Sequence, residues 1–278
     1  MRRAALVLLA VVSFTGFIVP ASKMAELMKA RGRFKAVVFN GDTFFNIGND
    51  YLDRAVPCRV VITPSGYVRQ DYKFPKAVVS IINEGTKQTM LVNNVRMGTS
   101  LPMFSRNNVF ALLMGLFLSN SPGNVFNEMG LDSTKVAYGL ANNRAAYIIG
   151  NDSDQMFIDN EQTVPLMFRV KYNNAYLYAV VKNYLNTARL IEGSATIKDR
   201  GNGGGIPLLV GAADYTETAV ILPQTVELYR GDMLAQRWLF TDAVLFPAGT
   251  GIKKLVLTPY EIKRLPFSRQ RLSPFMLF

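Results

Sequence analysis

The spacing of apolar residues changes from helical to alternating close to the N-terminus. Apolar residues at i, i+3 and i+4 predict one buried helical face, formed by Met24, Leu27 and Met28. Ser22 is a suitable N-cap, so we expect a helix over 22–31. From Phe34 onward the apolar positions have a period of two, which indicates β-strands.

About ten strands follow, and most are joined by short turns. The alternating segments are 34–45, 58–63, 66–74, 76–82, 87–92, 136–150, 156–159, 164–172, 176–182, 218–229 and 233–240. Gly41-Asp42 is a candidate bulge or turn, and Asn142-Asn143 is a candidate turn. Consecutive strands joined by short turns must be antiparallel, and the apolar face of such a sheet needs a cover. We therefore expect a mainly β protein (α+β) built on an antiparallel sheet.

A second helix is predicted in the middle of the chain. The segment 109–118 is apolar and carries large side chains at helical spacing, namely Phe110, Leu113, Met114 and Phe117. A short helical turn is expected at 125–129. The helices at 22–31 and 109–118 are the available covers for the apolar face of the sheet.

The N-terminal segment 1–21 has the pattern of a secretory signal peptide. Arg2 and Arg3 precede an apolar run, and small residues at 19–21 form a cleavage site. We expect cleavage after Ala21 and a periplasmic location. The alternative is an N-terminal membrane anchor, although the apolar run is slightly short for a span of about 20 residues.

Composition excludes several kinds of chemistry. The chain contains no histidine and a single cysteine, Cys58. The absence of histidine excludes Ser-His-Asp and Cys-His nucleophiles and His-ligated zinc. One cysteine excludes an intrachain disulfide, a cysteine-cluster metal site and a dithiol redox motif. No motif predicts a cofactor or a metal, so both are expected to be absent.

Two polar segments are candidate functional sites. The carboxylates Asp152, Asp154, Asp159 and Glu161 do not fit a calcium loop, because a strand-like segment interrupts them. We expect solvated loop charges there; a hydrolase using these carboxylates is the enzymatic alternative, and no motif favours it. The glycine-rich segment 201–205 lacks the ending of a phosphate-binding loop and is expected to be a surface loop.

The net charge of +11 is concentrated toward the C-terminus. The basic residues of the segment 251–278 are Lys253, Lys254, Lys263, Arg264, Arg269 and Arg271. One interpretation is contact with a membrane surface or an acidic partner; the other is a basic, solvated tail. Nucleic acid is not expected as a partner of an exported chain. The apolar end 274–278 is a candidate to dock on the body of the protein.

The chain is rich in large apolar side chains, with 18 Phe, 12 Tyr and 12 Met. If the helix at 109–118 fills the concave face of the sheet, these residues form only a core. If it covers that face loosely, they line a lipid-sized pocket with an adaptable lid. The candidate ligand-binding residues are Tyr72, Phe74, Met90, Val92, Phe110, Leu113, Met114, Phe117, Leu166, Phe168, Val170, Tyr172, Val226, Leu228, Trp238 and Phe240.

Four local motifs occur in a characteristic order. They are a Pro-Ser-Gly-Tyr-Val-Arg strand at 64–69, an Asn-Glu-Gly hairpin at 82–87, an F-I-D-N-E-Q-T-V-P-L hairpin at 157–166 and an I-L-P-Q-T-V strand within 221–229. Together with the signal peptide and the two helices, this order resembles the LolA-type periplasmic lipoprotein carriers and their superfamily of half-barrel lipid-binding proteins. The resemblance extends over about residues 22–245.

The resemblance implies a single curved antiparallel sheet over 22–250 that forms an incomplete β-barrel. Its concave face would receive acyl chains without covalent chemistry, so no enzyme activity is expected. Carriers of this type take lipoproteins from an inner-membrane transporter to an outer-membrane receptor. Arg59 and Arg69 are candidates for the functional arginine of the family. The alternatives are an envelope sensor or assembly module that binds a protein partner, and an outer-membrane β-barrel suggested by the terminal Phe278.

Overall fold

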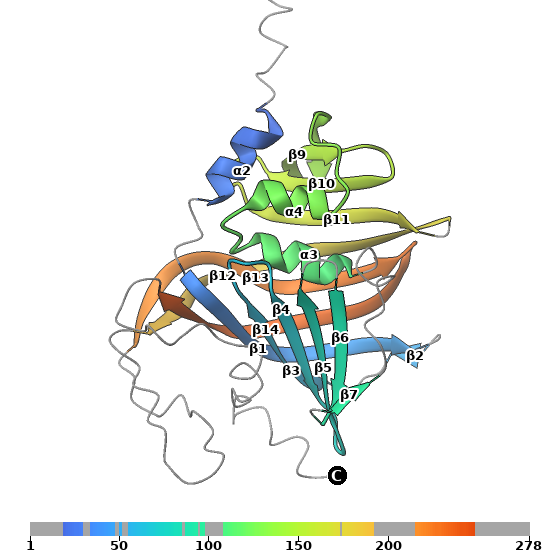
Figure 1. The fold of residues 1–278 in the computed structure, drawn as a ribbon, viewed down its shortest axis with the longest axis vertical. Helices are drawn as coiled ribbons and strands as arrows, with labels where there is room; N and C mark the ends of the chain where they lie inside the picture. Colours follow the sequence, from blue (N-terminus) through green and yellow to red (C-terminus); the bar gives the residue numbers. More distant parts are fainter. Residues whose placement is uncertain are drawn as a thin grey trace, which may run out of the picture.

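Most of the described chain belongs to one large β-sheet (Figure 1). The computed structural model describes residues 19–29, 34–47, 50–51, 55–84, 87–93, 95–97, 108–172, 174–191 and 215–247. The strands are β1 (Phe34–Ile47), β2 (Asp50–Tyr51), β3 (Val56–Ile62), β4 (Val68–Lys73), β5 (Val78–Glu84), β6 (Lys87–Val92), β7 (Val95–Met97), β8 (Val136–Ala141), β9 (Arg144–Gly150), β10 (Asp154–Asp159), β11 (Pro165–Tyr172), β12 (Ala175–Ile191), β13 (Tyr215–Arg230) and β14 (Met233–Pro247). The predicted signal peptide up to residue 18, the glycine-rich segment and the basic tail lie outside these ranges.

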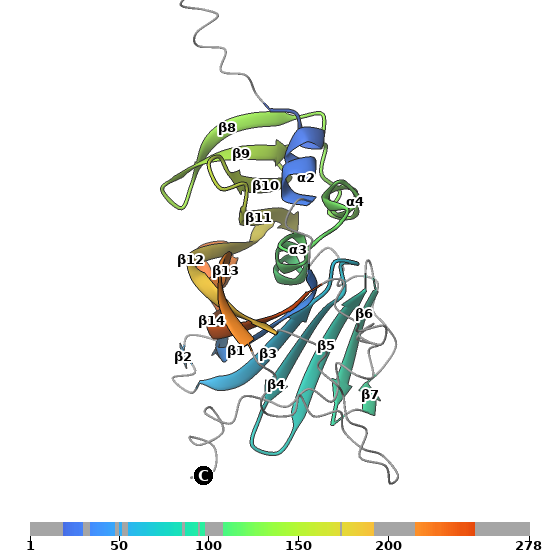
Figure 2. The same ribbon diagram turned by 90° about the vertical axis from the view of Figure 1, so that its left-hand side faces the viewer.

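The sheet is antiparallel and open, as the short turns predict. Its strand order is β7-β6-β5-β4-β3-β1-β14-β13-β12-β11-β10-β9-β8, with β2 paired to β1. The first long strand therefore pairs with the last, and β7 and β8 form the two edges of the path. The sheet curves so strongly that β12 also meets β14 through a short parallel pairing at Arg189 and Leu190 (Figure 2). The predicted fold class, mainly β with a single sheet that is not closed, is confirmed.

Two predicted backbone features are present. The pairing of β1 with β14 shifts register between Asn40 and Gly41, which is the predicted bulge. A Cβ atom on Gly41 would lie 2.2 Å from the carbonyl oxygen of Leu239, so only glycine fits this close approach. Asn142 and Asn143 have φ values of 51° and 61°, as the two-residue turn between β8 and β9 requires.

The N-terminal helix, α2 (Ala21–Lys29), differs from the predicted one in two respects. It begins one residue earlier, because the carbonyl of Pro20 accepts hydrogen bonds from the amides of Lys23 (2.9 Å) and Met24 (3.1 Å). Ser22 is therefore inside the helix rather than its N-cap. The buried face consists of Ala21, Met24 and Met28, whereas Leu27 is 43% exposed. The prediction for Leu27 was wrong because Ala21 supplies the third position of the face.

The internal apolar helix and the short helical turn after it are both present, with shifted bounds. α3 (Val109–Leu116) ends earlier than the predicted residue 118, with Phe117 as its C-cap. α4 (Pro122–Glu128) begins before the turn predicted at 125–129. α3 contacts β4 near one end of the sheet path and β11, β12 and β13 near the other. Figure 2 shows α3 within the curve of the sheet and α2 beside β9 and β10, while α4 contacts α2 and α3. The predicted cover of the concave face by an internal apolar helix is thus present.

The main core lies between α3 and the concave face of the sheet. Its cluster joins residues of all three described helices to strands from both halves of the sheet. A second, smaller cluster on the opposite face consists of Ala141, Ala146, Phe157 and Leu166. Within the described ranges, none of the helices is both long enough and apolar enough to cross a membrane.

Candidate functional site

Most of the candidate ligand-binding residues are buried in the contact between α3 and the concave face of the sheet. The members of this group are at most 4% exposed and belong to the main core; they are Tyr72, Phe110, Leu113, Met114, Phe117, Phe168, Val170, Val226, Trp238 and Phe240. α3 is buried almost all round, because Val109, Ala111 and Leu116 on its other sides are buried as well. Around α3 the concave face is therefore filled by protein. We call this region the sealed half.

A stacked pair of aromatic rings joins α3 to the sheet. The rings of Phe110 and Trp238 are 3.8 Å apart with an interplanar angle of 16°. The indole nitrogen of Trp238 donates to the hydroxyl of Tyr72 (3.2 Å), and Gln236 Nε2 donates to the same oxygen (3.3 Å). The Tyr72 hydroxyl in turn donates to Gln70. Burial raises the pKa of Tyr72, so its hydroxyl remains a neutral donor in this network.

Amide side chains join the N-terminus of α3 to the neighbouring strands. Asn108 caps the helix, since its side-chain oxygen accepts from the amide of Ala111 (3.2 Å). Its nitrogen donates to the side-chain oxygen of Asn83 on β5, which also accepts from Gln88 Nε2 at 3.0 Å. We call Asn83, Gln88 and Asn108 the amide seam.

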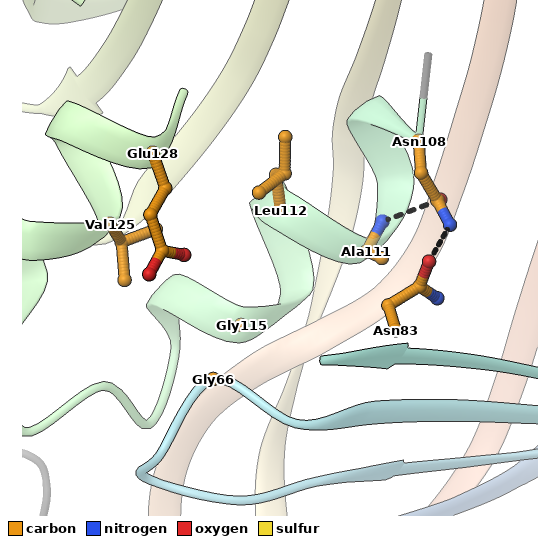
Figure 3. A pocket seen from close by; sticks show the side chains of 8 residues that line it. All are labelled: Gly66, Asn83, Asn108, Ala111, Leu112, Gly115, Val125 and Glu128. Atoms are coloured by element: carbon orange, nitrogen blue, oxygen red, sulfur yellow. Dashed lines mark hydrogen bonds between the residues drawn. The ribbon is translucent and has the colours of Figure 1, made fainter. Parts of the chain in front are cut away.

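A shallow pocket opens beside this seam (Figure 3). Its lining residues come from the β3–β4 turn, β5, the N-cap and length of α3, and α4; they are Gly66, Asn83, Asn108, Ala111, Leu112, Gly115, Val125 and Glu128. The pocket therefore lies where α3 meets the β3–β4 turn and β5.

The strands β4–β7 extend beyond α3, and none of the described helices lies over them there (Figure 2). Ile81 pairs with Met90, which pairs with Met97, and Val79 pairs with Val92, which pairs with Val95. Directly opposed residues point to the same face of a sheet. This is the face of the core, because Ile81 packs against it and Tyr72, the partner of Val79, belongs to it. We call Val79, Ile81, Met90, Val92, Val95 and Met97 the wing patch.

The wing patch is open to solvent. Met90, Val95 and Met97 are 45%, 65% and 48% exposed, and the other three members are partly buried. Sequence reasoning identified Met90 and Val92 but missed the rest of the patch. The alternation over 78–82 and 95–97 is the signal that could have identified Val79, Ile81, Val95 and Met97. Phe74, a further candidate, stacks on Phe45 at 6.1 Å and packs against the core.

Three candidates lie elsewhere. Tyr172 is partly buried on β11, and Leu228 is partly buried against the core. Leu166 belongs to the second cluster on the opposite face. A bulge causes this, because Phe157 pairs with Met167 while Ile158 pairs with Pro165. Alternation along this strand predicts that Leu166 and Phe168 face the same way, and the bulge makes this prediction wrong.

We call the strands β3–β7 the wing; the two candidate arginines, on β3 and β4, lie on its back and face away from the wing patch. Arg59 Nη2 and Arg69 Nε each lie 2.6 Å from a carboxylate oxygen of Asp71, and Arg69 Nη2 donates to Ser80 at 2.9 Å. All four side chains belong to residues that are at most 1% exposed. Removing one partner of such a buried cluster leaves an uncompensated charge. The geometry therefore gives both arginines a structural role beneath the wing.

The predicted group of solvated carboxylates contains one exception. Asp159 is 3% exposed and pairs with Arg144 at 2.9 Å. Its other oxygen accepts from the amides of Glu161 and Gln162, so it organises the β10–β11 turn. The prediction of a solvated charge was wrong for this residue. Among the residues that the structure describes, no group of three or more possible ligands is suited to a metal ion.

Neither a protein-family model nor a curated protein matches the chain. Its structure matches solved members of the LolA superfamily and outer-membrane lipoprotein-sorting domains over most of the chain, at low sequence identity. A LolA superfamily protein from Nitrosomonas europaea is 10% identical with a TM-score of 0.45, over 81% of this chain and 93% of that chain.

Two further structures show a similar likeness. A putative outer membrane lipoprotein-sorting protein domain from Vibrio parahaemolyticus is 11% identical with a TM-score of 0.44, over 84% of this chain and 94% of that chain. A DUF1329 family protein from Desulfovibrio piger is 10% identical with a TM-score of 0.43, over 81% and 93% of the two chains. At TM-scores below 0.5, these likenesses carry no information about the ligand of this chain.

Proposed function

We propose that this protein is a non-covalent carrier of acyl chains and that an acyl chain docks first on the wing patch. The supporting observation is that exposure on the two faces of the wing is the reverse of what is usual for apolar and charged side chains. Apolar side chains on its concave face are exposed, whereas Arg59, Arg69 and Asp71 on its back are buried. Contiguous exposed apolar surface is uncommon in monomeric proteins and marks binding sites.

The wing patch alone would hold an acyl chain only weakly. A fully buried methylene contributes about 0.8 kcal/mol. A chain lying on an open surface is buried on one side, so ten methylenes would contribute about 4 kcal/mol, which corresponds to a millimolar Kd. Useful affinity therefore requires enclosure. The chain would gain it by entering between the wing and α3, where the amide seam and the shallow pocket mark the boundary.

In this proposal α3 acts as a plug that fills the groove when no cargo is bound. Phe110, Met114 and Phe117 occupy the space that the acyl chain would share or take over. When the cargo leaves, α3 fills the groove again. Because α3 and the acyl chain occupy the same space, the affinity stays modest enough for transfer. No cofactor and no covalent step is needed.

The cellular setting follows from the sequence resemblance rather than from the geometry. The N-terminal segment predicts export to the periplasm, and the four motifs resemble carriers of lipoproteins. The cargo would be the acyl chains of a lipoprotein or a lipid, received from an inner-membrane transporter and passed toward the outer membrane.

Titration with a fluorescent fatty acid and native mass spectrometry with a triacylated lipopeptide test this proposal. Met90→Glu places a charge in the middle of the wing patch, and we expect at least a roughly tenfold weaker Kd for the fatty acid. Met233→Glu is the matched control, because Met233 is 51% exposed but lies at the β13–β14 hairpin. We expect wild-type binding for this control.

Two results would count against the proposal. A purified protein that takes up neither fatty acid nor lipopeptide would contradict the carrier function. Binding that is unchanged in a folded Met90→Glu variant would contradict the assignment of the wing patch. Circular dichroism of both variants separates a loss of binding from a loss of folding.

A further inference from the structure

No described strand pairs with β8 on its outer side, and β8 lacks the usual protection of such an edge. It occupies one end of the sheet path and consists of Val-Ala-Tyr-Gly-Leu-Ala, with neither a charge nor a proline. Tyr138 and Leu140 are 56% and 74% exposed. Natural proteins protect edge strands with charges, prolines, bulges or short length. The opposite edge, β7, is protected in this way because it spans only Val95–Met97 and includes Arg96.

The hairpin geometry shows which backbone groups of β8 face outward. Ala141 and Arg144 flank the two-residue turn and form the closing hydrogen-bonded pair. Hydrogen-bonded and non-hydrogen-bonded pairs alternate along an antiparallel ladder. The amides and carbonyls of Val136, Tyr138 and Leu140 therefore point away from β9, toward the open side of the sheet.

The side chains of these same residues form one apolar row. Tyr138 pairs with Tyr147 and packs edge-on against it at 5.7 Å, and Asn160 Nδ2 donates to the Tyr138 hydroxyl at 3.1 Å. The Tyr138 ring is thus already oriented. Val136 packs against the main core, whereas Leu140 lies at the exposed end of the row.

We propose that β8 pairs with β8 of a second copy of this chain, antiparallel, about a two-fold axis at Tyr138. In this register Tyr138 opposes Tyr138 of the partner subunit, and Val136 opposes Leu140 of the partner subunit. Every outward-facing amide and carbonyl of the strand then finds a partner. The register is self-complementary, because the residues with outward-facing groups are spaced symmetrically about Tyr138.

The charges that flank the strand are compatible with this pairing. Lys135 precedes β8 and lies 3.6 Å from Asp132 of its own chain. In the proposed register Lys135 opposes Ala141 of the partner subunit, so no like charges face each other. The exposed Leu140 is covered by Val136 of the partner subunit, which removes the most exposed large apolar side chain among the described residues from water.

Such a dimer would extend the sheet without obstructing the proposed ligand site. The wing strands β4–β7 lie at the other end of the strand order from β8. Pairing through β8 would leave the two wing patches at the outer ends of one continuous sheet. The inference is therefore independent of the carrier proposal, and each can fail alone.

Cysteine cross-linking of the full-length protein tests the register. Opposed residues of a hydrogen-bonded pair have Cα atoms about 5.5 Å apart, which allows a disulfide. We expect Tyr138→Cys to form a covalent dimer under mild oxidation. The matched control is Leu140→Cys, because the two copies of residue 140 would be about 13 Å apart in this register. The native Cys58 is 2% exposed, so it is not expected to compete.

Sedimentation velocity provides the second measurement. We expect a concentration-dependent dimer for the wild type and a dimer Kd raised at least roughly tenfold in Leu140→Lys, which places two charges at the edge. Met233→Lys changes an exposed apolar residue away from β8 and should leave the dimer unchanged. A wild type that is monomeric at about 100 μM, or equal cross-linking of Tyr138→Cys and Leu140→Cys, would overturn the proposal.

Discussion

The sealed half and the wing share the same alternation of apolar residues on the concave face, but the exposure of those side chains is opposite. In both regions the concave face carries large apolar side chains on alternating strand positions. Around α3, Phe168 and Trp238 are 1% exposed, whereas Met90 and Met97 on the wing are 45% and 48% exposed. The difference is the helix, since α3 covers one region and its N-terminus lies at the amide seam, before the other region. An apolar face becomes a core or a candidate binding surface according to what covers it.

The wing differs from the sealed half on its back as well. There the buried residues include the ion cluster of Arg59, Arg69 and Asp71, while the exposed concave face is apolar. Burying charges is costly unless they are paired, and Asp71 pairs with both arginines. Exposing apolar groups is unfavourable, and no such compensation is present for Met90, Val95 and Met97 among the described residues, which supports a functional interpretation of the wing patch.

The first prediction compares how much each region contributes to the free energy of unfolding. Phe110→Ala should lower the free energy of unfolding by about 3–5 kcal/mol, because it leaves a cavity against Trp238. Met90→Ala on the wing should cost less than about 1 kcal/mol. Urea unfolding followed by the fluorescence of Trp238, the sole tryptophan, measures both. A cost below about 1 kcal/mol for Phe110→Ala would show that α3 does not seal this half.

The second prediction tests whether α3 must move to admit an acyl chain. A Cβ atom at Gly115 would lie 3.7 Å from Val68 Cγ2, which brings α3 and β4 within reach of an engineered disulfide. Oxidised Val68→Cys/Gly115→Cys should bind the fluorescent fatty acid at least roughly tenfold more weakly than its reduced form.

The single variant Gly115→Cys, treated with the same oxidant, is the control for this experiment. Equal affinity of the oxidised and reduced double variant would mean that the wing patch holds the chain without any movement of α3. The boundary between the two regions would then be static.

The third prediction concerns the amide seam that divides the regions. Asn108→Ala removes both the helix cap and the bond to Asn83, so it should cost about 1 kcal/mol and speed amide hydrogen exchange in α3. Gln88→Ala, which leaves the cap intact, should have a smaller effect. Unchanged exchange in α3 of the Asn108→Ala variant would show that the seam does not hold the helix.

The smallest expected effect tests the edge of the wing patch. Met97→Ala should leave the free energy of unfolding within about 0.5 kcal/mol of wild type, because the residue is largely exposed. It should weaken fatty-acid binding by roughly threefold through lost apolar contact. Leu239→Ala, at an exposed position on β14, is the control and should bind as wild type. A tenfold loss in Leu239→Ala would place the ligand outside the wing patch.

Local features of this protein could be predicted from its sequence. The alternating strands, the bulge at Gly41, the turn at Asn142-Asn143 and an apolar helix near residue 109 all follow from side-chain spacing and backbone preference. So does the antiparallel arrangement, because short turns allow no other. These properties depend on residues that are near one another in the chain.

Side-chain environments were predicted less well. Alternation placed Leu166 beside Phe168, but a bulge opposite β10 turns Leu166 to the other face. Helical spacing placed Leu27 in the core, where Ala21 is found instead. The spacing of Arg59 and Arg69 did not show that both converge on Asp71, because that contact depends on the register of β3 and β4.

The order of residues in the chain thus establishes which of them are apolar, which strand positions alternate and where the chain turns. That Phe110 and Trp238 are core while Met90 and Met97 are surface follows from the three-dimensional packing instead. The physical reason is that periodicity determines the direction of a side chain relative to its own strand. Whether that direction leads to protein or to water depends on where α3 lies, and contacts between residues far apart in the chain determine that position.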